Sequence, residues 1–283
     1  MREAGAEPVR GDLDDPASLV EGIGGADTVF HAAAYVEEWG SRRDFERGNV
    51  DGTRHALEAA KRAGARRFVH VGTEAAILAG EPLLEVDETA PLRPDSKAYY
   101  ASTKAQAERL VRDAADGLET VVVRPRLVWG PGDTTVLPGL AEAVRRKRFA
   151  WIGGGTHRTS TTHVANVVEG LVLGAERGRS GEAYFVTDGE PVVFREFVTE
   201  LLATQGLEPP ERDMPPALAR AMAAASEGAW RLLPLPGAPP VTRMALWLSS
   251  LDTTIDISKA RRELGYEPVI SRPEGMDALR RRA

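Results

Sequence analysis

Short apolar runs alternate along the chain with longer segments in which apolar residues recur every three or four positions. The runs occupy residues 27–34, 67–72 and 120–123. Their length and nearly continuous apolar character are typical of strands covered on both faces in a parallel sheet. The periodic segments, which predict helices, occupy residues 16–23, 44–63 and 98–115. Strands and helices alternating at about 30-residue spacing predict right-handed crossovers and an α/β, doubly wound parallel sheet.

The chain opens abruptly. Residues 1–5 indicate the last turn of a helix ended by a glycine, and residues 7–10 indicate a short strand. Asp14 or Asp15 is the expected N-cap of the helix over 16–23, because a carboxylate there accepts the free amide hydrogens of the first turn.

After residue 124 the sequence pattern changes, because the regular alternation of apolar runs and helical segments ends. Two glycines and a proline at 130–132 break the chain. Further elements are expected at 136–148, 151–155, 164–175, 182–186, 194–202 and 258–265. The segment 209–240, rich in Pro, Ala, Leu and Trp, is predicted to be too broken for a long regular element. It is apolar enough to cover a hydrophobic pocket. The alternative is that its apolar residues simply pack in the core.

Composition restricts the class of protein. The 283 residues are 42% apolar and 28% charged, as in an ordinary globular protein large enough for a sizeable core. The net charge of −6 argues against a general nucleic-acid or anionic-membrane binder. The absence of cysteine excludes disulfides and thiolate chemistry, and no apolar run reaches the roughly 18 residues of a membrane helix. We expect a cytoplasmic protein with no membrane span and no nucleic-acid partner.

One helix carries candidate chemistry. Tyr100 and Lys104 are four residues apart and share a face of the helix over 98–115. An ammonium beside a phenol stabilises the phenolate, so the spacing predicts a lowered tyrosine pKa suited to proton exchange with a hydroxyl or carbonyl. A solvated helix face is the alternative for the pair alone.

Other singular residues follow the predicted strands. Asp12 follows the first, residues 32–34 close the second, Thr73 ends the third, and residues 125–128 end the fourth. Ligands of a doubly wound sheet bind beyond the carboxyl ends of its strands, so we expect these residues to line one crevice with Tyr100.

Five motifs together resemble one superfamily. They are Gly11-Asp12-Leu13, His31-Ala32-Ala33-Ala34, Asn49-Val50-Asp51-Gly52-Thr53, Tyr100-Ala101-Ser102-Thr103-Lys104 and Arg124-Pro125-Arg126-Leu127-Val128-Trp129-Gly130-Pro131-Gly132-Asp133. In this order they resemble the extended short-chain dehydrogenase/reductase superfamily, which includes NAD-dependent epimerases and dehydratases. The second half, at 184–191, 241–243 and 256–266, resembles its 3β-hydroxysteroid dehydrogenase-like branch.

The resemblance implies a role for each matching residue. Tyr100 is the implied general acid/base. Lys104 is implied to lower the pKa of Tyr100 and to bind the nicotinamide ribose. Thr73 is implied to bind the substrate oxygen, and Asn49 to hold a water of the proton relay. The implied cofactor contacts are Asp12, Leu13, Ala32, Ala33, Ala34, Lys104, Pro125 and Val128. Asp12 has an alternative as a turn former. The chain departs from the family at Gly72-Thr73, where Ser-Ser is more usual.

The resemblance also implies the fold and the activity. We expect a Rossmann-like domain over 1–130, with 160–180 packing back on it, and a smaller mixed α/β substrate-binding region over 131–283. The expected activity is that of an NAD(P)-dependent oxidoreductase that interconverts a secondary alcohol and a ketone on an apolar small molecule. The alternatives are a sugar-nucleotide epimerase or dehydratase and a non-catalytic, truncated cofactor-binding homologue. The sequence does not distinguish NAD from NADP.

The Gly-rich turn that holds the cofactor pyrophosphate in this superfamily does not precede Asp12, so we expect an N-terminally incomplete dinucleotide-binding unit. One hypothesis is that the natural chain begins upstream of Met1. The other is that the chain is natural as given, which predicts poor cofactor binding and an open strand edge that favours association, such as a homodimer.

Three further polar residues are open to two interpretations. His31 and His163 are expected to be structural histidines rather than bases. Arg158 is either a phosphate contact, if the substrate is a nucleotide sugar, or a solvent-facing side chain.

Overall fold

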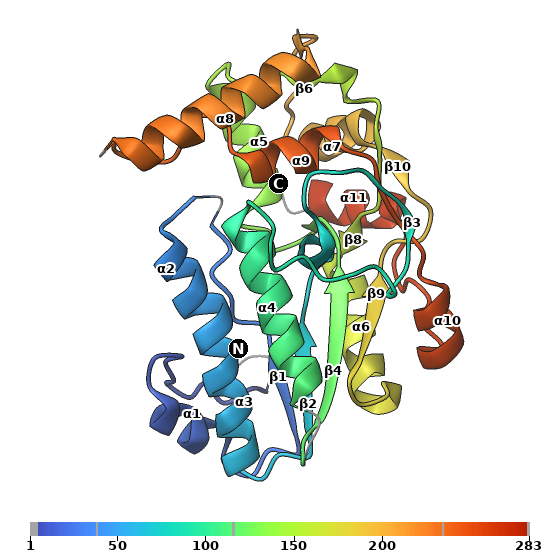
Figure 1. Ribbon diagram of the computed structural model, residues 1–283. Helices are drawn as coiled ribbons and strands as arrows, with labels where there is room; N and C mark the ends of the chain where they lie inside the picture. The colour runs from blue at the N-terminus through green and yellow to red at the C-terminus, as the bar shows by residue number, and fades with distance from the viewer. Residues whose placement is uncertain (1–4, 38, 115–116, 234, 282–283) are drawn as a thin grey trace.

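A four-stranded parallel sheet forms the centre of the protein (Figure 1). The computed structural model describes residues 5–37, 39–114, 117–233 and 235–281. The strands are β1 (Thr28–His31), β2 (Arg67–Val71), β4 (Glu119–Pro125) and β9 (Glu182–Val186), hydrogen-bonded in that order with every pair parallel. The α/β parallel sheet predicted from the apolar runs is confirmed.

Helices cover both faces of this sheet. On one face α3 (Gly52–Arg62) and α4 (Tyr99–Asp113) pack on Val122, and on the other α6 (Val164–Arg177) packs on its neighbour Val123. Because side chains alternate along a strand, consecutive valines of β4 serve opposite faces. The approach of α6 is close: a Cβ atom at Gly170 would lie 2.7 Å from Val186. Glycine lets the helix backbone reach the sheet.

The segment predicted as one helix over 44–63 is continuous but not uniform. It consists of α2 (Arg42–Phe45), a π-helical turn (Glu46–Asp51) and α3. π-Helical turns are rare and often occur at functional sites. This turn contains Asn49, one of the predicted site residues.

The start of the chain differs in part from the prediction. Helix α1 (Pro16–Ile23) is capped by Asp15, whose side chain accepts from the amides of Ala17 and Ser18. The strand predicted over 7–10 is wrong: these residues are irregular, since no neighbouring strand offers them backbone partners. The helix end predicted over 1–5 lies mostly outside the described residues.

The second half forms further elements beyond the carboxyl ends of the central strands, at the top and right of Figure 1. Its helices are α5 (Val136–Arg145), α7 (Phe194–Ala203), α8 (Pro216–Leu232), α9 (Arg243–Ser250), α10 (Ser258–Leu264) and α11 (Arg272–Arg280). The short strands outside the central sheet are β3 (Leu83–Val86) and β5 (Val128–Trp129), which precede residue 131, and β6 (Trp151–Ile152), β7 (Arg158–Thr159), β8 (Thr162–His163), β10 (Val192–Val193), β11 (Asp213–Met214) and β12 (Thr253–Ile255). Among the described residues, no helix is long and apolar enough to cross a membrane.

The prediction that residues 209–240 are too broken for a long element is wrong. Helix α8 spans 17 residues of that segment. Its prolines do not interrupt it, because Pro216 stands in the first turn, where no intrahelical amide hydrogen bond is needed. The alanine-rich interior then favours the helix. In Figure 1, α8 extends over the end of α4.

Candidate active site

Predicted cofactor contacts lie where parallel strands end. Residues 32–34 follow β1, and the first two are exposed. Thr73 follows β2 and is 9% exposed, while Pro125 ends β4. Val128 lies on β5, just beyond Pro125, with 37% exposure. Since β1, β2 and β4 are parallel, their carboxyl ends share one edge of the sheet, and the structure brings these residues to that edge.

Tyr100 and Lys104 lie one turn apart near the start of α4. Tyr100 is partly buried, and its phenol lies near Thr73. Lys104 is buried, and its Nζ atom donates to the carbonyl oxygen of Val71 at 2.8 Å and lies 3.4 Å from His70 Nε2. Because Val71 ends β2 and Thr73 follows it, three of the four predicted catalytic side chains, those of Thr73, Tyr100 and Lys104, stand at the end of one strand.

The protonation of this group differs from the prediction. Burial raises the pKa of Tyr100 well above its ordinary value, and the charge of Glu74 raises it further. Burial also lowers the pKa of Lys104 to about 8. The expected lowering of the Tyr100 pKa by Lys104 is therefore wrong for this structure. The ammonium is engaged by the Val71 carbonyl, and the charge that governs the phenol is that of Glu74.

Glu74 is a site residue that the sequence did not reveal. It is 3% exposed, accepts a hydrogen bond of 2.8 Å from Thr73 Oγ1, and forms an ion pair with Arg126. Arg126 is also buried and donates from Nε to Thr159 Oγ1 at 3.1 Å. The Thr73 hydroxyl hydrogen is thus directed to a carboxylate, and its Oγ1 atom also accepts from the Ala75 amide at 3.2 Å, which leaves one lone pair for a donor at this edge of the sheet.

The signal for this ion pair was present but not decisive. Glu74 precedes five apolar residues, and Arg126 stands within an apolar loop motif. Charges in such settings are seldom buried unless they are paired. The 52 residues between the partners left the pairing to the tertiary structure.

Asn49 acts as a clamp in this structure. Its Nδ2 atom donates to the Tyr35 carbonyl at 3.1 Å and to Thr103 Oγ1 at 3.0 Å, and its Oδ1 accepts from the Tyr35 amide at 2.7 Å. Both amide hydrogens are therefore used to join the π-helical turn to the segment after β1 and to α4. The predicted water-holding role of Asn49 is untested and stays a prediction.

Asp12 and Leu13 make contacts with other residues than the predicted catalytic group. Asp12 is exposed, and its Oδ1 accepts from the Asp14 amide at 2.9 Å, which is the turn-forming role that we gave as the alternative. Leu13 packs against the core near α3, and its carbonyl accepts from His55 Nδ1 at 2.6 Å. The second carboxylate oxygen of Asp12 accepts no hydrogen bond within the described residues, so an adenine contact stays a prediction.

Packing explains the departure from Ser-Ser at Gly72. A Cβ atom at that position would lie 2.7 Å from Val122 Cγ1. The backbone there is held tightly, because the Gly72 amide donates to the Val123 carbonyl at 2.8 Å. Glycine is therefore the residue that fits between β2 and β4.

The two histidines are structural, as predicted. His31 is 6% exposed, lies 3.1 Å from Thr53 Oγ1 and stacks on His70, and its pKa falls to about 4 through burial. His163 is buried and caps α6 by accepting from the Ala165 amide at 3.2 Å. Neither is placed as a base for the phenol.

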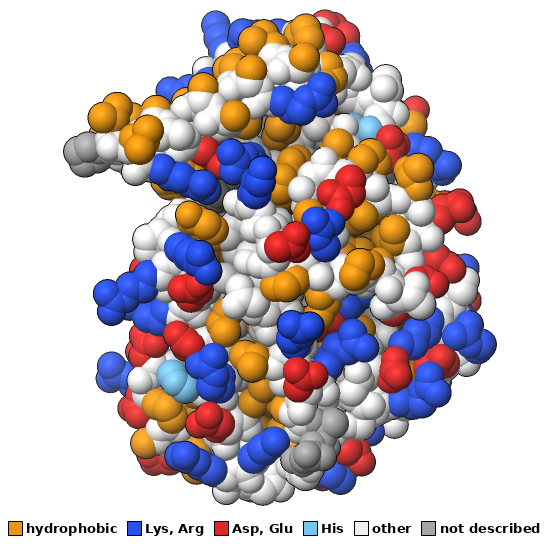
Figure 2. Space-filling model, in the orientation of Figure 1, with side chains coloured by type: hydrophobic (Ala, Val, Ile, Leu, Met, Phe, Trp, Pro, Cys, Tyr) orange, Lys and Arg blue, Asp and Glu red, His pale blue; other side chains and the backbone are white. Residues whose placement is uncertain are grey.

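A narrow pocket opens beside Tyr100, under the arm that α8 forms. It is lined by Trp39, Gly40, Phe45, Lys97, Ala98, Tyr99, Tyr100, Glu227, Arg231, Thr242 and Met244. Figure 2 shows the indentation below this arm, with Lys and Arg side chains at its edges. The pocket combines a predicted catalytic residue with an aromatic wall.

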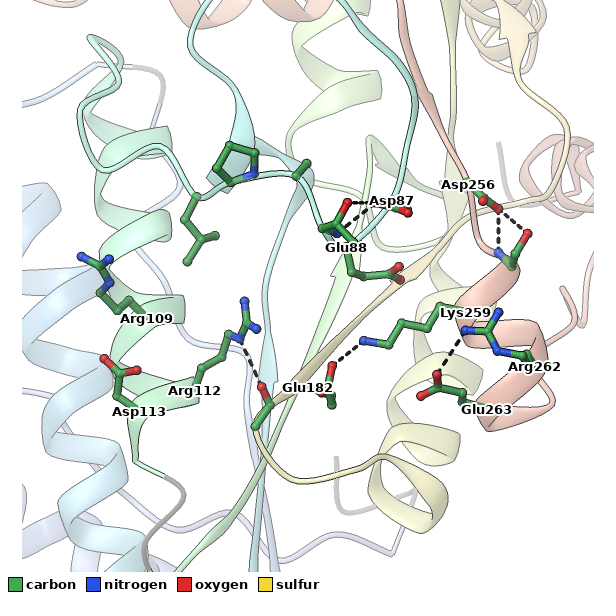
Figure 3. Close-up of a pocket in the computed structure, with 16 residues that line it drawn as sticks. Asp87, Glu88, Arg109, Arg112, Asp113, Glu182, Asp256, Lys259, Arg262 and Glu263 are labelled. Carbon is green, nitrogen blue, oxygen red and sulfur yellow. Dashed lines mark hydrogen bonds and ion pairs between the residues drawn. The ribbon is translucent and has the colours of Figure 1, made fainter.

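A wider cleft, of about 840 Å³, lies near the other end of α4 (Figure 3). Its charges are largely satisfied: Lys259 donates to Glu182 at 2.6 Å, and Arg262 to Glu263 at 3.2 Å. None of the predicted site residues lines it. Its size reflects a gap between α4, β9 and α10 on the surface rather than a catalytic arrangement.

A family model describes most of the chain. The model of the 3-beta hydroxysteroid dehydrogenase/isomerase family matches residues 2–216. The chain belongs to that family. The predicted branch is thereby confirmed, and with it the extended short-chain dehydrogenase/reductase superfamily. The family's enzymes interconvert alcohols and ketones, and this chain is an oxidoreductase of that type.

Two curated relatives are similar over nearly the whole chain. One is a 4-hydroxy-2-methyl-3-oxo-4-farnesyl-3,4-dihydroquinoline-1-oxide ketoreductase of Stigmatella aurantiaca, 48% identical over 99% of this chain and 84% of its own. The other is a 2-alkyl-3-oxoalkanoate reductase of Stenotrophomonas maltophilia, 37% identical over 99% of this chain and 87% of its own. Both names describe reduction of a ketone.

Solved structures share the fold. The crystal structure of gox2253 has a TM-score of 0.76 at 27% identity and covers 98% of this chain and 86% of its own. A dTDP-glucose 4,6-dehydratase from Streptomyces venezuelae, solved with NAD, has a TM-score of 0.75 at 24% identity, covering 99% and 81%. The Rossmann-like fold is confirmed.

Proposed function

We propose that the protein uses NAD(P)H to reduce a ketone on an apolar small molecule, and NAD(P)⁺ in the reverse direction. The observation that carries this proposal is the meeting of Thr73, Tyr100 and Lys104 at the end of β2, beside a pocket with an aromatic wall. A phenol holds its proton at neutral pH unless its pKa is strongly lowered, and the pKa of Tyr100 is raised by burial, so the proton that a ketone oxygen needs is present on Tyr100.

The residues present fit one half of the cofactor. Exposed alanines at 32 and 33 leave open space at the strand ends, and buried Lys104 would offer a donor for the nicotinamide ribose, with Pro125 and Val128 as further proposed contacts. The pyrophosphate half has no Gly-rich cradle among the described residues. At α1 the free amides of the first turn are already bound by the Asp15 carboxylate. Asp12 and Leu13 are the proposed contacts of the adenine end.

The proton chemistry follows from the side chains. The cofactor, when bound, supplies the hydride that adds to the carbonyl carbon. Tyr100 donates its phenol proton to the carbonyl oxygen, which balances the new negative charge and yields the alcohol. Thr73, directed by Glu74, accepts a hydrogen bond from the product hydroxyl and so positions it. We further propose that Asn49 supports this group through its link to α4.

The substrate class follows from the pocket and the relatives. Trp39, Phe45 and Met244 give the pocket an apolar wall. The relatives' names include a farnesyl or an alkyl chain, and each also includes an oxygen that carries negative charge in addition to the ketone: the oxygen of a dipolar N-oxide or that of a carboxylate. We propose the same combination for this protein.

The broader assignments belong to the same proposal. Residues 1–130, with 160–180, form the cofactor-binding part, and residues 131–283 form the substrate-binding part. We expect a cytoplasmic enzyme that is a homodimer, with a small molecule and no nucleic acid as its partner.

The test is turnover by the 283-residue chain and by Tyr100→Phe. NADPH and NADH oxidation are measured with a 2-alkyl-3-oxoalkanoate, and dTDP- and UDP-sugars are screened for conversion without net NADH formation. We expect ketone reduction by the wild type and at least a hundredfold loss in the variant, with an unchanged circular dichroism spectrum. Full activity in the variant would refute the mechanism, and sugar-nucleotide turnover alone would favour the epimerase or dehydratase alternative.

A further inference from the structure

Two cations line the pocket that holds Tyr100. They are Lys97, in the loop just before α4, and Arg231, in the last turn of α8. The pocket also has one carboxylate, Glu227, which is 5% exposed. Whether a ligand meets net positive charge here depends on which cation neutralises this carboxylate.

Glu227 is neutralised mainly by Arg243. Its Oε1 atom accepts from the Arg243 amide at 2.7 Å, and its Oε2 lies 3.2 Å from Arg243 Nη1. Arg231 Nη2 is farther from Oε2, at 3.6 Å, and Oε2 accepts a hydrogen bond from neither arginine. Two arginines thus share one carboxylate, which leaves one positive charge uncompensated among the described residues, and Arg231 is the more weakly held of the two.

Arg231 is held in place by aromatic rings instead. Its guanidinium carbon lies 4.8 Å from the centre of the Tyr99 ring and 5.7 Å from that of Trp39. Cation–π contacts with two rings fix the plane of the guanidinium and leave its N–H groups free. Among the described residues, none accepts a hydrogen bond from the Arg231 side chain, which is 36% exposed.

Lys97 adds a second uncompensated charge. Its side chain is exposed and forms no ion pair within the described part of the chain. It lies three residues before Tyr100, on the segment that leads into the same helix. An oriented guanidinium and a nearby ammonium at a pocket with apolar walls suit an anionic oxygen on an apolar body.

We propose that Arg231, assisted by Lys97, binds an anionic oxygen of the substrate, a carboxylate or an N-oxide, while Tyr100 meets the ketone. This inference rests on the proposed function and deepens it. Arg231 is then a specificity-determining residue: it selects ketones that carry such an oxygen over neutral ketones of the same shape.

The test compares a matched pair of substrates. A freshly prepared 2-alkyl-3-oxoalkanoate and its methyl ester are reduced by the wild type, by Arg231→Gln and by the control Arg220→Gln, an exposed arginine of α8 that does not line the pocket. We expect the wild type to prefer the acid by about tenfold or more, as for a hydrogen bond to a charged group. Arg231→Gln should raise KM for the acid by a similar factor and leave the ester unchanged.

Binding gives a readout that does not depend on turnover. The corresponding 3-hydroxy acid and its ester are titrated into each variant by calorimetry, and the acid should lose its advantage only in Arg231→Gln. Equal binding of acid and ester to the wild type, or an equal loss for both in Arg231→Gln, would overturn the inference. Preferential acid binding without any ketone reduction would support the inference and count against the proposed function.

Discussion

Lys104 is expected to lower the free energy of unfolding, because its ammonium group is buried. It is 4% exposed, and burial lowers its pKa from 10.5 to about 8. One pKa unit corresponds to about 1.4 kcal/mol, so keeping the ammonium charged costs the folded state about 3 kcal/mol at neutral pH. Its hydrogen bond to the Val71 carbonyl returns about 1 kcal/mol. Lys104→Met, which conserves the volume of the stem, should therefore stabilise the fold by about 2 kcal/mol at pH 7 while it abolishes turnover.

The pH dependence makes this prediction specific. The folded pKa lies below the unfolded one, so the cost is complete below about pH 8 and disappears as the pH rises from about 8 toward 10.5. The free energy of unfolding of the wild type should therefore rise relative to that of Lys104→Met between about pH 8 and 10.5. Near pH 10.5 the wild type should become the more stable of the two.

Urea denaturation followed by circular dichroism, at pH 7, 8, 9 and 10 and without cofactor, measures the difference. Lys61→Met, which changes an exposed lysine of α3, is the control and should leave the stability nearly unchanged at every pH. A wild type more stable than Lys104→Met at pH 7, or a difference independent of pH, would refute the reasoning.

Three further changes have clear expected results. Glu74→Gln removes the charge that raises the pKa of Tyr100, so the basic limb of the pH profile for ketone reduction should move to lower pH; an unmoved limb would contradict this. Glu108→Gln leaves Arg124, which is fully buried, without its carboxylate partner and should cost about 3–5 kcal/mol in urea unfolding, whereas a loss below about 1 kcal/mol would argue against the pair. Gly72→Ser should cost about 1–3 kcal/mol by overpacking, and a stabilised variant would show that β2 and β4 separate easily.

Cofactor affinity depends on a unit that the described residues only partly supply. The superfamily holds the pyrophosphate at a Gly-rich turn, and here the α1 amides are bound by Asp15. The contacts that we propose for Lys104 and the open strand ends concern the nicotinamide end.

The periodicity of apolar residues in the sequence predicted most of the central strands and helices. Each buried strand and the helix of Tyr100 and Lys104 depend on contacts repeated every two to four residues, so the sequence shows them directly. The same order of motifs led to the family, because strand ends in a parallel sheet fall at one edge whatever the details of packing. The failure at α8 has a local cause as well: its prolines were taken as breaks, although one of them starts the helix.

The tertiary structure alone decided the electrostatics of the site. Glu74 meets Arg126 across 52 residues, and Arg231 reaches Trp39 and Tyr99 from the far end of the chain. Such pairings depend on how elements pack, which no local pattern encodes. The Tyr100–Lys104 spacing suggested a lowered tyrosine pKa, but burial and the nearby carboxylate reverse its sign. The sequence therefore proposed the reacting residues, and the three-dimensional arrangement of charge and burial sets how they are protonated.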